Sequence, residues 1–149
     1  MNNEITLELL KTCEVIKLEG KGLREELFKN AAEKTDLALA DYLTIRDLKA
    51  LSGCGDDALD ALLISMFRAL EEGSLCLKLT GEALKKRLDL FLAEGSEKLA
   101  AQIMENAEKG RYADLIGRSM EEYKPLIIRR QKDSAYIYFQ KYLKQAVYC

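Results

Sequence analysis

Residues 56–79 of the chain, DDALDALLISMFRALEEGSLCLKL, carry the clearest structural pattern in the sequence. From Leu59 to Leu70 the apolar residues recur at three- and four-residue steps, the spacing of one continuous helix face. Asp56 and Asp57 offer a capping oxygen and a favourable negative charge at the start of this helix. Gly73 suits the left-handed position at its end. The stretch therefore predicts a long, capped amphipathic helix.

The segments on both sides of this helix also carry patterns that predict secondary structure. Leu75–Leu79 alternates around Lys78, which is the period of a strand. The remaining segments before residue 110 show helical spacing, and a single Pro and few β-branched runs favour helices there. The further helices that we expect lie at Glu4–Leu18, Leu23–Ala31, Leu37–Leu51, Thr80–Gly95 and Ser96–Gly110.

The last quarter of the chain changes character. Leu126–Arg129 and Ala135–Tyr138 are two expected strands, joined by a polar turn of about five residues. A weaker segment around Leu115 and Ile116 precedes them, and a short amphipathic helix is expected after Phe139. The predicted fold is a single domain over residues 1–149, mainly α, with a small β element consisting of the short strand and the C-terminal hairpin.

Composition indicates a soluble globular protein. The chain has 149 residues, 48% of them apolar and 32% charged, which suits one domain with a packed core. No stretch approaches the roughly 20 apolar residues of a membrane helix, and no signal-peptide pattern opens the chain. We expect a cytoplasmic protein with no membrane partner.

The chain lacks residues that several classes of active site require. The chain has no His, which excludes Ser-His-Asp and Cys-His nucleophile pairs and His-based metal sites. Neither a phosphate loop nor G-x-G-x-x-G is present. The four cysteines form no C-x-x-C pair, disulfides are not expected, and Cys76 is interpreted as a small buried hydrophobe. We assign no catalytic residue, cofactor or metal.

Charge is uneven along the chain. The net charge is −2, yet from Arg111 to Cys149 eight Lys and Arg stand against four acidic residues. A helix-turn-helix over Thr44–Leu51 and Asp56–Glu72 is disfavoured, because its second helix would carry five acids and one Arg toward DNA phosphates.

The basic and aromatic C-terminal region is the best candidate for partner contact. The candidate residues are Arg129, Arg130, Lys132, Tyr136, Tyr138, Lys141 and Tyr142. Such a mixture can stack bases and neutralise phosphates, and it also suits a protein interface. A third interpretation is that the aromatics complete the core while the charges are solvated.

Two blocks of sequence resemble one known family. Residues 58–79 combine a Leu- and Ala-rich helix with Glu-Gly-Ser-Leu-Cys-Leu-Lys-Leu, and residues 124–143 combine Pro and an apolar strand with Ile-Tyr-Phe-Gln-Lys-Tyr-Leu. Both resemble segments of the N-terminal domain of RecD, the alpha chain of bacterial exodeoxyribonuclease V. Ser74 replaces the usual His, Leu143 the usual Trp, and the hairpin turn lacks the common Gly-Asp. The blocks cover 42 of the 149 residues.

The resemblance implies an assembly role. It implies the first domain of a longer RecD-like helicase chain, which docks onto a RecC-like subunit and reaches DNA through the RecBCD complex in double-strand break repair. ATP and Mg²⁺ would belong to the motor downstream, and this part would be catalytically inert. The alternative is an autonomous DNA-binding module that uses the basic and aromatic hairpin.

Overall fold

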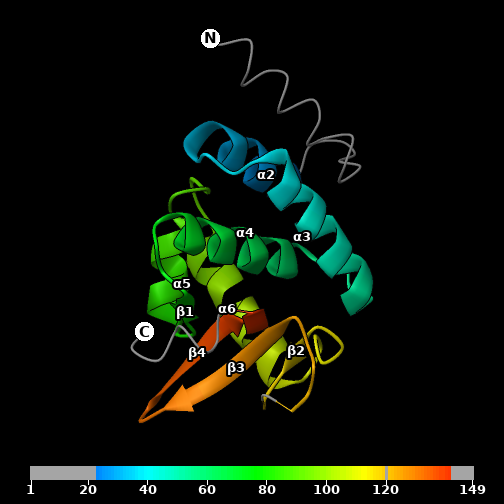
Figure 1. Ribbon diagram of the computed structural model, residues 1–149. Helices are drawn as coiled ribbons and strands as arrows, with labels where there is room; N and C mark the ends of the chain where they lie inside the picture. Colours follow the sequence, from blue (N-terminus) through cyan, green and yellow to red (C-terminus); the bar gives the residue numbers. More distant parts are fainter. Residues whose placement is uncertain (1–22, 120, 142–149) are drawn as a thin grey trace.

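The computed structural model describes residues 23–119 and 121–141. Within these ranges helices stack on one side of a four-stranded sheet, so the predicted mainly helical fold with a small β element is confirmed (Figure 1). The helices are α2 (Leu23–Lys34), α3 (Leu39–Ser52), α4 (Asp57–Glu71), α5 (Gly81–Leu88) and α6 (Ser96–Glu108). The strands are β1 (Cys76–Lys78), β2 (Ile116–Gly117), β3 (Leu126–Gln131) and β4 (Ser134–Phe139).

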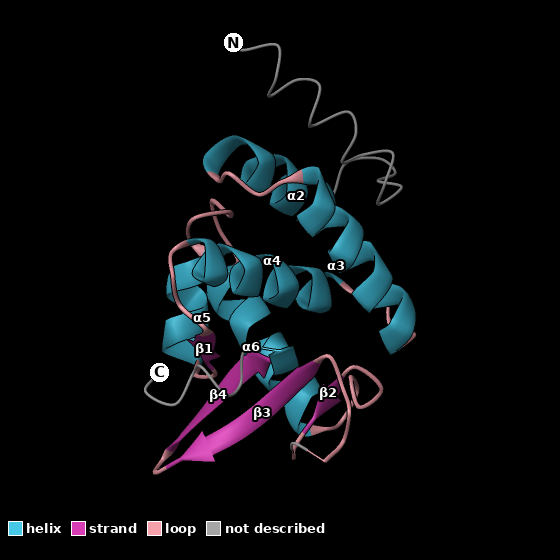
Figure 2. Ribbon diagram, in the orientation of Figure 1, coloured by secondary structure: helices cyan, strands magenta, loops and turns pink. Residues whose placement is uncertain are grey.

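Helix α4 is the centre of the helical layer (Figure 2). Asp56 caps it as predicted, because its carboxylate accepts a hydrogen bond from the Leu59 amide at 2.7 Å. Gly73 follows with a left-handed φ of 93°. The helix packs against α2, α3, α5, α6 and β1. It is therefore buried on more than the one apolar face that its spacing predicts, and even Asp60 and Ser65 are fully buried.

Helix α5 is shorter than predicted. The sequence pattern extends it to Gly95, but it ends at Leu88. The Leu88 carbonyl then accepts hydrogen bonds from the amides of both Phe91 and Leu92, each at 2.9 Å. This tight turn buries the Phe91 ring completely and brings the Phe91 carbonyl to the Asn30 side-chain amide. The burial of Phe91 in the core thus favours this turn over a longer helix α5.

The sheet has the strand order β1-β4-β3-β2. Strand β4 is central and antiparallel to both neighbours, with Cys76 opposite Tyr138 and Gln131 opposite Ser134. The hairpin turn is two residues, Lys132 and Asp133, rather than the five predicted, because the polar residues on either side remain paired. Strand β2, parallel to β3, was expected only as a weak segment; two residues are too short to show a period.

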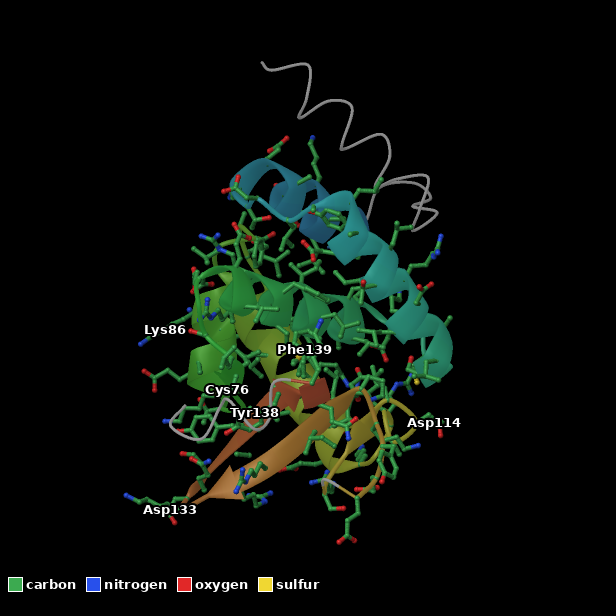
Figure 3. The ribbon with its side chains drawn as sticks, viewed as in Figure 1. Cys76, Lys86, Asp114, Asp133, Tyr138 and Phe139 are labelled. Carbon is green, nitrogen blue, oxygen red and sulfur yellow. The ribbon has the colours of Figure 1, made fainter. Side chains whose placement is uncertain are left out.

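The two faces of the sheet differ. Leu77, Ile137 and Ile128 form one cross-strand row on the inner face and join the main core beneath the helices. Phe139 points the same way and packs on Phe67 of α4, with ring centroids 4.9 Å apart. Figure 3 shows Phe139 reaching the helical layer, while its neighbour Tyr138 lies beside Cys76.

Cys76 corrects the sequence interpretation. It is half-buried on the outer face, where it packs with Tyr138. Its sulfur is disulfide-bonded, whereas Cys54 is a free thiol. The interpretation of Cys76 as a simple buried hydrophobe is therefore wrong, because its strand places it outside the main core. The expectation of no disulfide is wrong at the same residue, because scattered cysteines carry no local pattern that shows which of them the fold brings together. The helix expected at Glu4–Leu18 and most of the helix expected after Phe139 lie outside the described residues.

Candidate interaction surface

The β3–β4 hairpin divides the predicted contact residues between its two faces. Successive side chains of a strand point to opposite faces, so Arg129 shares the outer face with Ile127, while Arg130 shares the inner face with Ile128. Both arginines are exposed, because the hairpin extends beyond the helices. The sequence placed them on one patch, and the structure separates them.

Lys132 and Lys141 mark opposite ends of the hairpin region. Lys132 is exposed at the turn, with a left-handed φ of 56°. Lys141 is exposed just beyond the other end of β4, near α3. Six residues of strand lie between the turn and that end, which spans about 20 Å at the rise of a β-strand. The seventh candidate, Tyr142, lies outside the described residues.

Tyr138 is buried rather than available for contact. It is 0% exposed, and its hydroxyl accepts a hydrogen bond from the Gln131 side-chain amide at 3.4 Å. Burial raises the pKa of this hydroxyl above its ordinary value, although the nearby Arg129 guanidinium opposes the shift. The ring of Tyr138 therefore belongs to the outer apolar cluster with Ile127, and it offers no open face for stacking.

Tyr136 keeps a partly exposed position between two cations. It is half-buried on the outer face. The register places Lys78 of β1 on one side of it and Arg129 of β3 on the other. We call these three residues the outer row. Lys78 is not among the predicted contact residues. The alternating pattern predicts that Lys78 belongs to a strand, but only the pairing of β1 with β4 brings it beside Tyr136.

A groove lies between α3 and the open end of the hairpin. Its volume is about 430 Å³. The apolar residues that line it are Leu48 of α3, Phe67 and Leu70 of α4, Pro125 and Phe139. Asp41 and Lys141 contribute one charge of each sign. Thr44 and Gln140 add neutral polar groups to the lining. The groove is therefore more apolar than polar and electrically balanced, which suits a protein segment better than a polyanion.

Helix α3 extends the apolar wall of this groove. Asp41, Thr44 and Leu48 recur at three- and four-residue steps and line the groove together. Leu51 continues that face by one more turn and is 52% exposed. An exposed leucine next to an apolar groove is a feature of interaction surfaces.

A cluster of polar side chains around Asp56 stabilises the fold and is not a candidate binding site. The Asp56 carboxylate, besides capping α4, binds the Arg111 guanidinium at 2.8 Å and accepts a hydrogen bond from the Tyr112 hydroxyl at 2.9 Å. Partial burial raises the pKa of Asp56, but these hydrogen bonds and the Leu59 amide lower it more, so the net shift is downward. The cluster holds the α3–α4 turn against the segment after α6.

Neither a metal centre nor a membrane span is found in the described ranges. Over residues 23–119 and 121–141 no group of three or more Cys, Asp or Glu side chains could hold a metal ion. No helix in that part of the chain is long and apolar enough to cross a bilayer.

Comparison with known proteins identifies no relative. No protein family, curated protein or solved structure matches this chain.

Proposed function

We propose that this chain is the assembly domain of a RecD-like subunit, which it docks onto a RecC-like subunit of an exodeoxyribonuclease V complex in the cytoplasm. In that complex the domain supports an ATP-dependent 5′-to-3′ helicase and exonuclease acting on double-strand DNA ends. ATP and Mg²⁺ belong to the motor of the parent subunit, and the domain itself has no catalytic role.

The position of the groove carries this proposal. Block 58–79 provides α4 and β1, and block 124–143 provides β3 and β4. These separate blocks meet in space, because β1 pairs with β4 and Phe67 packs on Phe139. Both blocks line the groove beside α3. The segments that resemble the family thus build one apolar surface, which is the kind of surface that protein docking needs.

The docked segment is expected to be an apolar helix or loop of the RecC-like subunit. A groove between a helix and a sheet end accepts apolar side chains at helical spacing. Leu48 is the central test position, because it lines the groove and is only partly buried. Its replacement by Asp places a charge in the interface without removing a fully buried core residue.

Binding to a purified RecC-like subunit from the same genome tests the proposal. Isothermal titration calorimetry should show binding by the wild-type chain and at least about 30-fold weaker binding by Leu48→Asp, the loss typical of an interface hot spot. Leu90→Asp is the matched control, because Leu90 is also exposed, at 45%, but does not line the groove. Failure of the wild-type chain to bind, or equal losses in both variants, would contradict the proposal.

The absence of catalysis in the isolated chain is a separate prediction. The purified chain should hydrolyse no ATP above the buffer rate, with or without DNA, because its sequence has no phosphate loop. Steady ATP turnover that follows the chain through purification would refute the inert assembly role.

The alternative of an autonomous DNA-binding module has weaker support. Of its seven predicted contact residues, Arg129 and Arg130 point to different faces, and Tyr138 is buried. The hairpin as a whole therefore offers no single basic and aromatic platform. Within the hairpin region, only the outer row still combines exposed cations with an accessible aromatic ring.

A further inference from the structure

We propose that the outer row, Lys78, Tyr136 and Arg129, is a contact site for single-stranded nucleic acid. The three residues come from three adjacent strands, and each is the register partner of the next. This site does not depend on the docking proposal, because it lies on the opposite face of the sheet from the helices and needs no partner subunit.

The geometry places an aromatic ring between two cations on a sheet face. Adjacent strands lie about 4.8 Å apart, so the Cα atoms of Lys78 and Arg129 are about 10 Å apart with Tyr136 between them. Lys78 and Arg129 are both exposed, and Tyr136 is half-buried. The cations can bind phosphates while the ring stacks on a base, which is how sheet surfaces recognise single strands.

The neighbouring rows give Tyr136 a fixed support. On one side the outer face is filled by Cys76, Tyr138 and Ile127, and Tyr136 packs against this cluster. On the other side the next row is Gln131 opposite Ser134, and the turn beyond it carries Lys132 and Asp133, the only acidic residue of the hairpin. The ring is therefore held by apolar contacts in a predominantly basic setting.

Charge and chemistry favour a single-stranded nucleic acid over two other ligands. The bases of a duplex are stacked on one another, so Tyr136 could not reach a base face. An acidic peptide would use Lys78 and Arg129 but would gain little from the ring between them. Only an unpaired nucleic acid strand uses both the cations and the aromatic ring.

Fluorescence anisotropy with a labelled oligothymidylate and the full chain tests the site. At low salt we expect binding that weakens steeply as salt rises. Tyr136→Ala should weaken it about 5-fold or more, the effect of losing one stacked base. Lys78→Gln and Arg129→Gln should each weaken binding and reduce the log–log salt slope by about 0.7.

Arg130→Gln is the matched control. It removes the same charge from the adjacent position of the same strand, but on the inner face, so binding should remain within about 2-fold of wild type after loss of one diffuse charge. Circular dichroism confirms that each variant is folded, and Lys78→Gln tests the site through an exposed side chain if Tyr136→Ala is unstable.

Three results would overturn the inference. One is the absence of oligothymidylate binding at low salt. Another is an equal loss in Arg129→Gln and Arg130→Gln, which would indicate general charge attraction. The third is binding of a polyglutamate peptide in place of the oligonucleotide, with no effect of Tyr136→Ala, which would assign the row to an acidic protein partner.

Discussion

Lys49 and Lys78 show how differently one residue type serves two regions of this molecule. Lys49 of α3 is 9% exposed, and its ammonium nitrogen lies 2.7 Å from a carboxylate oxygen of Asp60, which is 0% exposed. Lys78 lies in the outer row and is exposed. A buried charge must be paired, whereas a charge in water keeps its solvation. The first lysine therefore holds α3 to α4, and the second can meet a ligand.

The largest expected effect comes from breaking the buried pair. Lys49→Met leaves the Asp60 carboxylate buried without this cation and should lower the free energy of unfolding by about 3–5 kcal/mol. Urea denaturation followed by circular dichroism measures the loss. Lys78→Met is the control and should change stability by less than about 0.5 kcal/mol.

The double variant Lys49→Met/Asp60→Leu sharpens the same comparison. Because no buried charge remains, most of the lost stability should return. If Lys49→Met were no less stable than Lys78→Met, the buried pair would have no structural role.

The next largest difference in stability is expected between substitutions on the two faces of the hairpin. Ile137 is 0% exposed on the inner face, so Ile137→Ala should cost about 2–5 kcal/mol through lost burial and a cavity. Arg129→Ala, opposite Tyr136 on the outer face, should cost less than about 0.5 kcal/mol. Similar urea midpoints for both variants would contradict the assignment of the faces.

Asp56 predicts a pH dependence. Its pKa in the folded chain lies below the ordinary 3.8. The carboxylate therefore contributes its full stability above about pH 3.8 and loses it as the pH falls through the depressed folded pKa. Asp56→Asn keeps a capping oxygen but removes the charge that meets Arg111, so it should cost up to about 1 kcal/mol at pH 7, and unfolding curves should show this difference shrinking in acid. A difference that stays constant down to pH 2 would argue against the shift.

The hairpin turn predicts the smallest effect, and a stabilising one. Lys132 holds a left-handed φ of 56°, which glycine adopts without steric cost. Lys132→Gly should therefore stabilise the chain by up to about 1 kcal/mol, seen as a higher Tm. Asp133→Gly should give no gain, since Asp133 has no positive φ.

Local patterns in the sequence predict much of the helical layer. The cap at Asp56, the end of α4 before Gly73 and the bounds of α6 follow from residues within a few positions of one another. The pattern fails for α5, where the amide of Asn30, far along the chain, binds the Phe91 carbonyl after the helix has ended. It also misjudges the hairpin turn, because polar strand residues resemble a loop.

The candidate contact surface was less predictable. The sequence selected Arg129 and Tyr136, which do share a face, but it grouped them with Arg130 and Tyr138. These residues were grouped because they are close together in the sequence. Successive residues of a strand point to opposite faces, so neighbours in the sequence are separated in the structure. The groove could not be predicted at all, because it needs α3, α4 and the hairpin together.

Local signals in the amino-acid sequence are sufficient to predict the capped helix α4, the strand after it and a C-terminal hairpin. Periodicity and capping act over a few residues, so they are visible without the fold. Three features arise only when the elements pack together: Lys49 meets Asp60, Lys78 lies beside Tyr136, and Tyr138 is buried. These features depend on contacts between segments that are distant in the sequence, and no pattern of neighbouring residues predicts such contacts.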